Sequence, residues 1–110
     1  MTVTQAMNLL PARWHIPLIR DTMATLQYVL TDVPDGEPTE IFITFDKGDV
    51  SVFTGTSPSE PDLTVMLKAE DFVAMVGHKV KIMDLIRAKK MTVKGDTPLA
   101  RRLFVAAETI

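Results

Sequence analysis

The sequence contains no cysteine. Without thiols the chain cannot form disulfide bonds, cysteine-ligated zinc sites, iron–sulfur clusters or a thiol nucleophile, so its fold depends on packing. No apolar run approaches the roughly 18–20 residues that a membrane span needs. The first residues, MTVTQAMNLLPARW, lack the basic start and unbroken apolar stretch of a signal peptide. We therefore expect a soluble cytoplasmic protein.

Groups that carry catalysis or bind metal ions are also scarce. The two histidines, His15 and His78, lie far apart without a flanking ligand pattern. No serine lies in a nucleophile elbow, and neither a GxGxxG motif nor a Walker loop occurs. His78 has two interpretations, a base near a pocket mouth or a solvated residue just beyond a helix end. These absences predict a protein that is not an enzyme and needs no cofactor or metal.

Charge is nearly balanced overall but unevenly distributed. The formal net charge is −2, which does not favour nucleic acid as a partner. Residues 1–60 hold three basic and eight acidic side chains, whereas residues 61–110 hold nine basic and six acidic ones. Any attraction to anionic partners is therefore expected in the C-terminal half.

Length and composition are those of one ordinary globular domain. The chain has 110 residues, of which 46% are hydrophobic and 24% charged, and it contains no internal repeat and no long linker. We expect a single domain over residues 1–110.

Five segments are typical of β-strands because apolar residues alternate along them or because turn signals flank them. Residues 33–36 (VPDG) and 46–49 (DKGD) are such turns. For the first segment a helical stripe of Leu26, Val29 and Leu30 is the alternative. The predicted strands are residues 25–31, 40–46, 49–54, 62–67 and 91–94.

Three later segments have helical periodicity: residues 69–76, 81–88 and 98–108. Gly77 is placed to end the first of them, and Asp96 or Thr97 to cap the last. In the last helix one face holds Leu99, Leu103, Ala106 and Ile110.

The N-terminal residues give a weaker signal. A helical turn could follow Thr4, but Pro11 and Pro17 interrupt any longer helix. From Pro17 a helix is expected whose face holds Leu18, Ile19 and Met23.

Two kinds of side chain stand out, and each has a structural and a functional interpretation. Seven methionines are present, and this flexible side chain suits either ordinary core filling or a cavity for ligands of varied shape. Basic residues flank the last three predicted elements. They are interpreted either as a solvated face or as a site that attracts an anionic membrane or a phosphorylated head group. The densest part of this group is Lys79, Lys81, Arg87, Lys89 and Lys90.

Two stretches carry a resemblance to a known family. Residues 61–77 (PDLTVMLKAEDFVAMVG) combine an acidic strand start, an acidic residue plus Phe at a helix start, and a closing glycine. Residues 90–103 (KMTVKGDTPLARRL) combine a basic-apolar strand, Gly-Asp and a helix with Leu-Ala. In this order they resemble the sterol carrier protein 2 family over about residues 25–107, while residues 1–20 match poorly.

The chain departs from the family pattern at two places beside the expected tunnel. Ile86, Arg87 and Lys89 stand where family members usually carry aromatic residues and a glycine. Lys81 and Ile82 stand where an Asn-Pro or Asp-Pro pair often opens a helix.

The resemblance implies an α+β fold in which a five-stranded, mostly antiparallel sheet carries helices on one face around an apolar tunnel. It also implies non-covalent binding of a fatty acyl chain, acyl-CoA, sterol, phospholipid or quinone-type molecule. Our leading hypothesis is a non-enzymatic carrier of such a molecule, driven by burial of apolar surface. The expected lining residues are Phe72, Met75, Val76, Ile82, Leu85, Ile86, Leu99, Leu103 and Phe104.

Two rival functions remain open. The same apolar surface could close a homodimer or dock an enzyme partner, as an accessory module whose tunnel is vestigial. An enzyme domain with a small-molecule pocket is the other, although the sequence offers no residues for it. For the carrier, transient contact with an anionic membrane through Lys79, Lys81, Arg87, Lys89 and Lys90 is expected.

Overall fold

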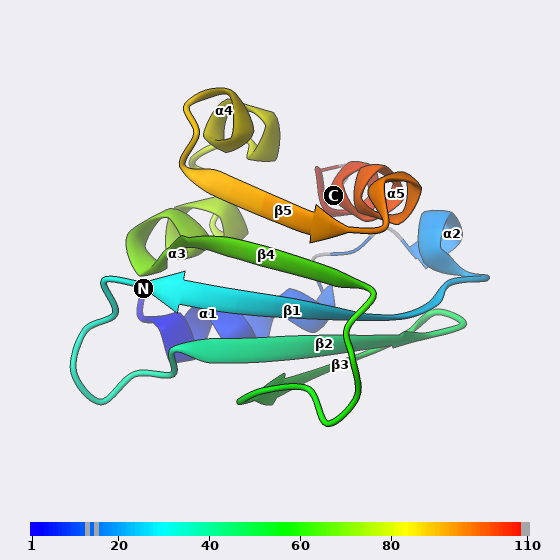
Figure 1. Ribbon diagram of the computed structural model, residues 1–110, viewed down its shortest axis with the longest axis horizontal. Coiled ribbons are helices and arrows are strands. Elements are labelled where there is room, and N and C mark those ends of the chain that lie inside the picture. The colour runs from blue at the N-terminus through cyan, green and yellow to red at the C-terminus, as the bar shows by residue number, and fades with distance from the viewer. Residues whose placement is uncertain (13, 15, 109–110) are drawn as a thin grey trace.

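The computed structural model describes residues 1–12, Trp14 and residues 16–108, and its strands form one mixed sheet (Figure 1). The strands are β1 (Met23–Thr31), β2 (Glu40–Asp46), β3 (Asp49–Thr54), β4 (Leu63–Lys68) and β5 (Met91–Gly95). Their order is β3-β2-β1-β4-β5, with β1 and β4 parallel and every other pair antiparallel. The predicted α+β fold with a five-stranded, mostly antiparallel sheet is confirmed.

The helices cover one face of this sheet. They are α1 (Val3–Leu9), the 3-10 turn η1 (Leu10–Ala12), α2 (Ile16–Ile19), α3 (Ala69–Val76), α4 (Ile82–Arg87) and α5 (Thr97–Glu108). Alternate residues of the central strand, Leu26, Tyr28 and Leu30, are buried in the same cluster as Phe72 of α3 and Leu103 of α5. A half-buried sheet has this period of two, because successive side chains point to opposite faces.

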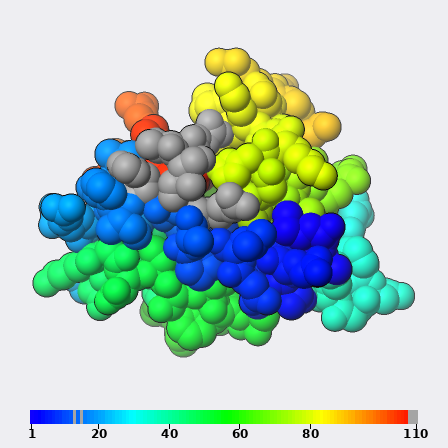
Figure 2. All heavy atoms as spheres, turned by 180° about the vertical axis from the view of Figure 1, so that it is seen from behind, coloured from blue at the N-terminus to red at the C-terminus, as the bar shows by residue number. Residues whose placement is uncertain are grey.

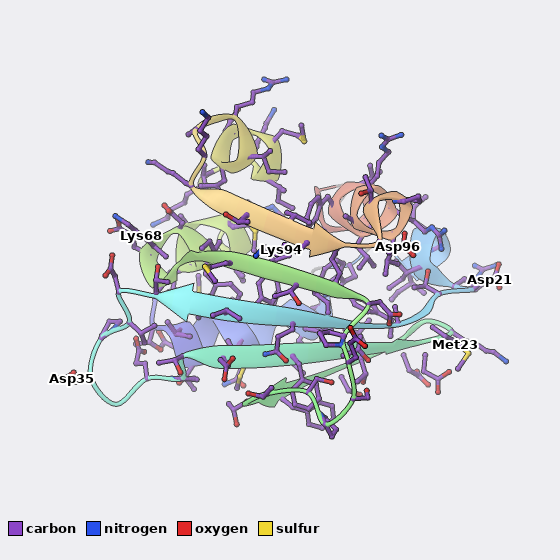
Figure 3. The ribbon with its side chains drawn as sticks, in the orientation of Figure 1. Asp21, Met23, Asp35, Lys68, Lys94 and Asp96 are labelled. Atoms are coloured by element: carbon purple, nitrogen blue, oxygen red, sulfur yellow. The ribbon has the colours of Figure 1, made fainter. Side chains whose placement is uncertain are left out.

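The first strand starts earlier than the sequence pattern suggests. β1 begins at Met23, where Met23 pairs with Asp46 across the sheet. The expected helix face holding Leu18, Ile19 and Met23 is therefore wrong: α2 ends at Ile19, and Met23 is exposed at the end of the molecule near Asp21 (Figure 3). The backbone explains the difference, since Thr22 N–H donates to Ile19 O at 3.0 Å and Lys47 N–H donates to Thr22 O at 3.0 Å.

The N-terminal helix also starts earlier than expected, before Thr4. Thr2 is its N-cap: the Thr2 hydroxyl accepts from Gln5 N–H at 3.1 Å, and Gln5 Oε1 accepts from Thr2 N–H at 2.8 Å. This reciprocal capping box satisfies two backbone donors that the first turn otherwise leaves free. Val3 and Ala6 then face the core.

The ends of the later helices follow the sequence closely. The α3 bounds agree with the prediction and Gly77 is its C-cap, but the left-handed residue is His78, with φ of 58°. At the start of α5, Asp96 Oδ1 accepts from Leu99 N–H at 3.1 Å, which selects Asp96 of the two predicted caps. Ile110 and His15 lie outside the described residues.

The connection from β3 to β4 crosses the sheet face that carries no helices (Figure 1). Gln27, which is 4% exposed, holds this connection from β1. Its Nε2 donates to Gly55 O at 3.1 Å, and its Oε1 accepts from Ser57 N–H at 2.8 Å. A buried amide that satisfies both ends in this way fixes the loop on the sheet, because releasing it would leave polar groups unpaired.

Gly95, the last residue of β5, lies against the start of β4. Its φ is 120°, and a Cβ built on it would overlap Asp62 O. Gly36, in the β1–β2 turn, has φ of 83° but open space around a Cβ. The two glycines therefore share a positive φ but differ in whether an added Cβ has room.

We predict that Gly95→Ala destabilises the protein more than Gly36→Ala does. The strained φ alone costs about 1–2 kcal/mol at either position, and only at Gly95 must the β4–β5 backbone also separate. Urea unfolding of both variants measures the difference. Equal losses of unfolding free energy would contradict the close approach of Gly95 to β4.

Candidate functional site

A cavity of about 240 Å³ lies on the helix side of the sheet. Its walls come from five places in the fold: the N-terminal segment, β1, the end of α3, the α3–α4 linker with the start of α4, and the end of α5. The lining residues are Leu10, Trp14, Tyr28, Met75, Val76, His78, Val80, Lys81, Ile82 and Ala107. Most of these side chains are apolar, so the cavity is suited to an apolar ligand.

Tyr28 is the one lining residue that the sheet supplies, so it forms the floor. Its ring meets that of Phe72 edge to face, with centroids 5.2 Å apart. Burial raises the pKa of the Tyr28 hydroxyl far above its ordinary value, because the charged phenolate would lose its hydration. The floor of the cavity therefore carries a neutral hydroxyl.

The N-terminal segment supplies another wall through Leu10 and Trp14. Figure 2 shows this segment (blue) lying across the back of the molecule, beside the region of α3 (yellow-green). Trp14 is 3% exposed and its ring meets Phe45 of β2 edge to face, with centroids 5.0 Å apart. Its Nε1 is buried, and it has no hydrogen-bond partner among the described residues.

The α3–α4 linker forms the rim. His78, Val80 and Lys81 line the cavity there, and His78 and Lys81 are exposed. His78 thus combines both of its predicted settings, since it lies just beyond a helix end and beside a pocket. Within the described part of the chain no group of three His, Cys, Asp or Glu residues could hold a metal ion.

All five residues of the basic cluster (Lys79, Lys81, Arg87, Lys89 and Lys90) are exposed. Among the described residues the cluster forms no ion pair, the one such pair being Lys68–Asp32 at 3.8 Å. Lys81 borders the cavity, whereas Lys89 and Lys90 border a second hollow of about 270 Å³, where Glu70 and Asp71 also lie. The cluster therefore extends along α4 from one hollow to the other.

Three of the nine residues expected to line a tunnel border this cavity: Met75, Val76 and Ile82. Phe72 lies fully buried behind the Tyr28 ring. The remaining five are packed into or against the core away from the cavity lining: Leu85, Ile86, Leu99, Leu103 and Phe104. Ligand contact by any of the nine stays a prediction.

Sequence reasoning missed the contributions of the N-terminal segment and of β1. Leu10 and Trp14 belong to a stretch that gave no clear periodicity, and Tyr28 belongs to a segment identified as an ordinary strand. The one available signal was that the single tryptophan and the single tyrosine both lie in the first 28 residues. Large aromatic rings are usually buried, so both were candidates for the core.

Comparison with protein families then identifies the fold. The model of the SCP-2 sterol transfer family matches residues 4–108. The chain belongs to this family. The match begins at residue 4 and so extends over the N-terminal segment. Comparison with curated protein sequences finds no match.

Solved structures of SCP-2 folds are similar to this family member at low sequence identity. The palmitated SCP2L2 protein of Aedes aegypti superposes with a TM-score of 0.73 at 22% identity, covering 98% of this chain and 96% of that one. The ubiquinone synthesis protein UbiJ-SCP2 superposes with a TM-score of 0.67 at 18% identity, covering 97% and 88%. At these identities the likeness concerns the fold.

A bacterial enzyme contains the same fold as one part of a longer chain. The inverting sec-alkylsulfatase Pisa1 of Pseudomonas sp. superposes with a TM-score of 0.76 at 20% identity over 96% of this SCP-2 chain. This chain spans only 16% of the sulfatase's length.

Membership of the SCP-2 family implies lipid binding or transfer. In the described residues, no helix combines the length and apolar character needed to cross a membrane.

Two buried residues of α4 allow a cavity-lining position to be compared with a packed core position. Ile82 borders the cavity, whereas Leu85, one turn later, does not. We predict that Leu85→Ala costs about 2–5 kcal/mol, as in a filled core, and that Ile82→Ala costs less because its side chain already borders empty space. Chemical denaturation measures both losses. A larger loss for Ile82→Ala would show that the cavity wall is packed like the core.

Proposed function

We propose that this SCP-2 family member is a non-enzymatic carrier that holds a lipid or another long apolar molecule in the cavity above Tyr28. The cavity itself is the observation that carries the proposal: apolar side chains from both ends of the chain meet over the sheet and leave space between them. Each methylene group that leaves water for such a site contributes about 0.8 kcal/mol to binding.

The volume limits how much of a ligand the cavity holds in this form. A water-sized group takes about 30 Å³, so about 240 Å³ accommodates a segment of chain rather than a complete long lipid. The rest of the ligand must extend through the mouth at the α3–α4 linker or widen the cavity by displacing Met75, whose side chain is flexible.

Trp14 provides a direct test because it is the only tryptophan and lines the cavity. We predict that a fatty acid brominated along its chain quenches the intrinsic fluorescence, because the bromine atoms lie against the indole ring. The same fatty acid without bromine is the control. Mass spectrometry of lipid extracted from the purified protein identifies any natural cargo. Absence of both quenching and co-purified lipid would refute the carrier function.

A carrier must also exchange its cargo with a membrane, and we propose that the basic cluster makes this contact. Each basic side chain near an anionic surface contributes about 1 kcal/mol. The five exposed cations form no ion pair with a described residue, and Lys81 borders the cavity mouth. The cluster thus presents the mouth toward the surface that holds the cargo.

We predict that the protein co-sediments with vesicles that contain anionic lipid. High salt should weaken this binding because the Debye length falls. At low salt, the double variant Lys79→Gln with Lys81→Gln should bind the same vesicles more weakly than the wild-type protein does. Lys47→Gln with Lys94→Gln is the matched control, since these two lysines are exposed and lie in the β2–β3 turn and on β5 rather than around α4 (Lys94 is labelled in Figure 3). An equal loss of vesicle binding in both double variants would show that net charge, and not the position of Lys79 and Lys81, determines the binding.

A second candidate is an accessory role in which the fold docks an enzyme partner or forms a homodimer. The volume of about 240 Å³ favours it, because ligand pockets usually measure about 300–1,000 Å³. The SCP-2 fold of the ubiquinone synthesis protein is consistent with such a role. Size measurement at several protein concentrations, alongside the lipid analysis, separates it from the carrier.

A further inference from the structure

The Tyr28 hydroxyl is open to the cavity. The Tyr28 side chain is 2% exposed and lines the cavity, and its hydroxyl takes part in no hydrogen bond with the described residues. Among these residues, Trp14 Nε1 is the one side-chain polar atom that is both completely buried and without a hydrogen-bond partner. The Tyr28 hydroxyl is therefore not sealed in protein, and its small exposed area must lie in the cavity.

Two residues of the cavity lining thus carry a hydrogen-bond donor without an acceptor among the described residues: Tyr28 O–H, which is open to the cavity, and Trp14 Nε1–H, which is enclosed by protein. Buried polar groups in proteins are nearly always paired, so an exception at a cavity calls for an explanation. An oxygen atom of a bound ligand would supply the missing acceptor for Tyr28.

The charge of that oxygen follows from its surroundings. The charged residue in the lining is Lys81, which lies on the exposed rim with His78, whereas the sheet-side floor is formed by Tyr28. The hydroxyl is neutral at physiological pH, as that of an ordinary tyrosine is, and burial raises its pKa further. Taking a carboxylate to such a floor without a cation beside it would be costly, whereas a hydroxyl or carbonyl oxygen needs only the hydrogen bond.

We infer that Tyr28 determines specificity by hydrogen-bonding an uncharged oxygen at the end of the ligand that lies deepest in the cavity. The inference rests on the proposed carrier function and deepens it. The cargo class is a long apolar molecule that enters with a hydroxyl, ketone or ester oxygen first. A free fatty acid binds in the opposite sense, with its chain against Tyr28 and its carboxylate near Lys81.

Three probes with the same chain length test this assignment: hexadecan-1-ol, methyl palmitate and palmitate, each titrated against Trp14 fluorescence. Tyr28→Phe should weaken binding of the alcohol or the ester about three- to tenfold, the usual effect of one hydrogen bond, and change palmitate binding less than twofold. Lys81→Gln should do the reverse, weakening palmitate and leaving the alcohol and ester unchanged. If Tyr28→Phe weakens binding of only the alcohol, the natural partner of Tyr28 is a hydroxyl. If it weakens binding of only the ester, the natural partner is a carbonyl.

The outcomes are distinct. Tyr28→Phe keeps the ring that packs against Phe72, and the removed hydroxyl pairs with no described residue, so its melting temperature should match the wild type. Equal weakening of all three probes, or none, overturns the role of Tyr28 while leaving the carrier intact. Failure of every probe to bind the wild-type protein overturns the carrier proposal and this inference together.

A second measurement needs no variant. Tyr28 is the only tyrosine, so isotope-labelled tyrosine gives a single C–O band in the labelled-minus-unlabelled infrared spectrum, which reports on its hydroxyl without overlap from Trp14. The alcohol or the ester should shift the tyrosine band, and palmitate should not. A shift of the same size with palmitate would overturn the assignment.

Discussion

The pairing of β1 with both β2 and β4 is the constraint on which the rest of the structure depends. It places β1 at the centre of the sheet, where each of its two faces is covered by a different part of the chain. Tyr28 faces the helices and the cavity, whereas its neighbour Gln27 faces the connection from β3 to β4. Because β4 is parallel to β1, the chain must cross the sheet to reach it, and Gln27 holds that crossing in place.

The same arrangement explains why the cavity exists. The helices α3, α4 and α5 follow β4 in the chain, while α1, η1 and α2 precede β1, so the two groups reach the same sheet face independently. Short helices of 4 to 8 residues dominate this layer, α5 with 12 residues being the longest. Such helices bury limited apolar surface each. Where their ends meet over Tyr28, the side chains of the described residues leave part of the space unfilled.

The sequence predicts the parts of this fold that depend on local patterns. The hairpin of β2 and β3 was obtained to the residue because alternation and a turn signal agree there. Local pattern could not reveal that β1 extends to Met23, since this depends on pairing with Asp46. Nor could it place Trp14, whose position is set by contact with Phe45. The expected lining was drawn from helix faces alone, whereas the cavity also needs a strand and the N-terminal segment.

Stability and ligand binding make opposite demands on the residue at the floor. A phenylalanine at position 28 could keep the ring contact with Phe72 and would place no unpaired hydroxyl in an apolar cavity, so packing alone gives no reason for a tyrosine. The hydroxyl donates a hydrogen bond only when a water molecule or a ligand oxygen in the cavity accepts it. Polar groups that a fold leaves unsatisfied at a site able to hold a ligand are expected where function competes with stability. In this member of the SCP-2 family, the competition that we infer lies at the Tyr28 hydroxyl on the central strand, while the other unpaired donor, Trp14 Nε1–H, is enclosed by protein.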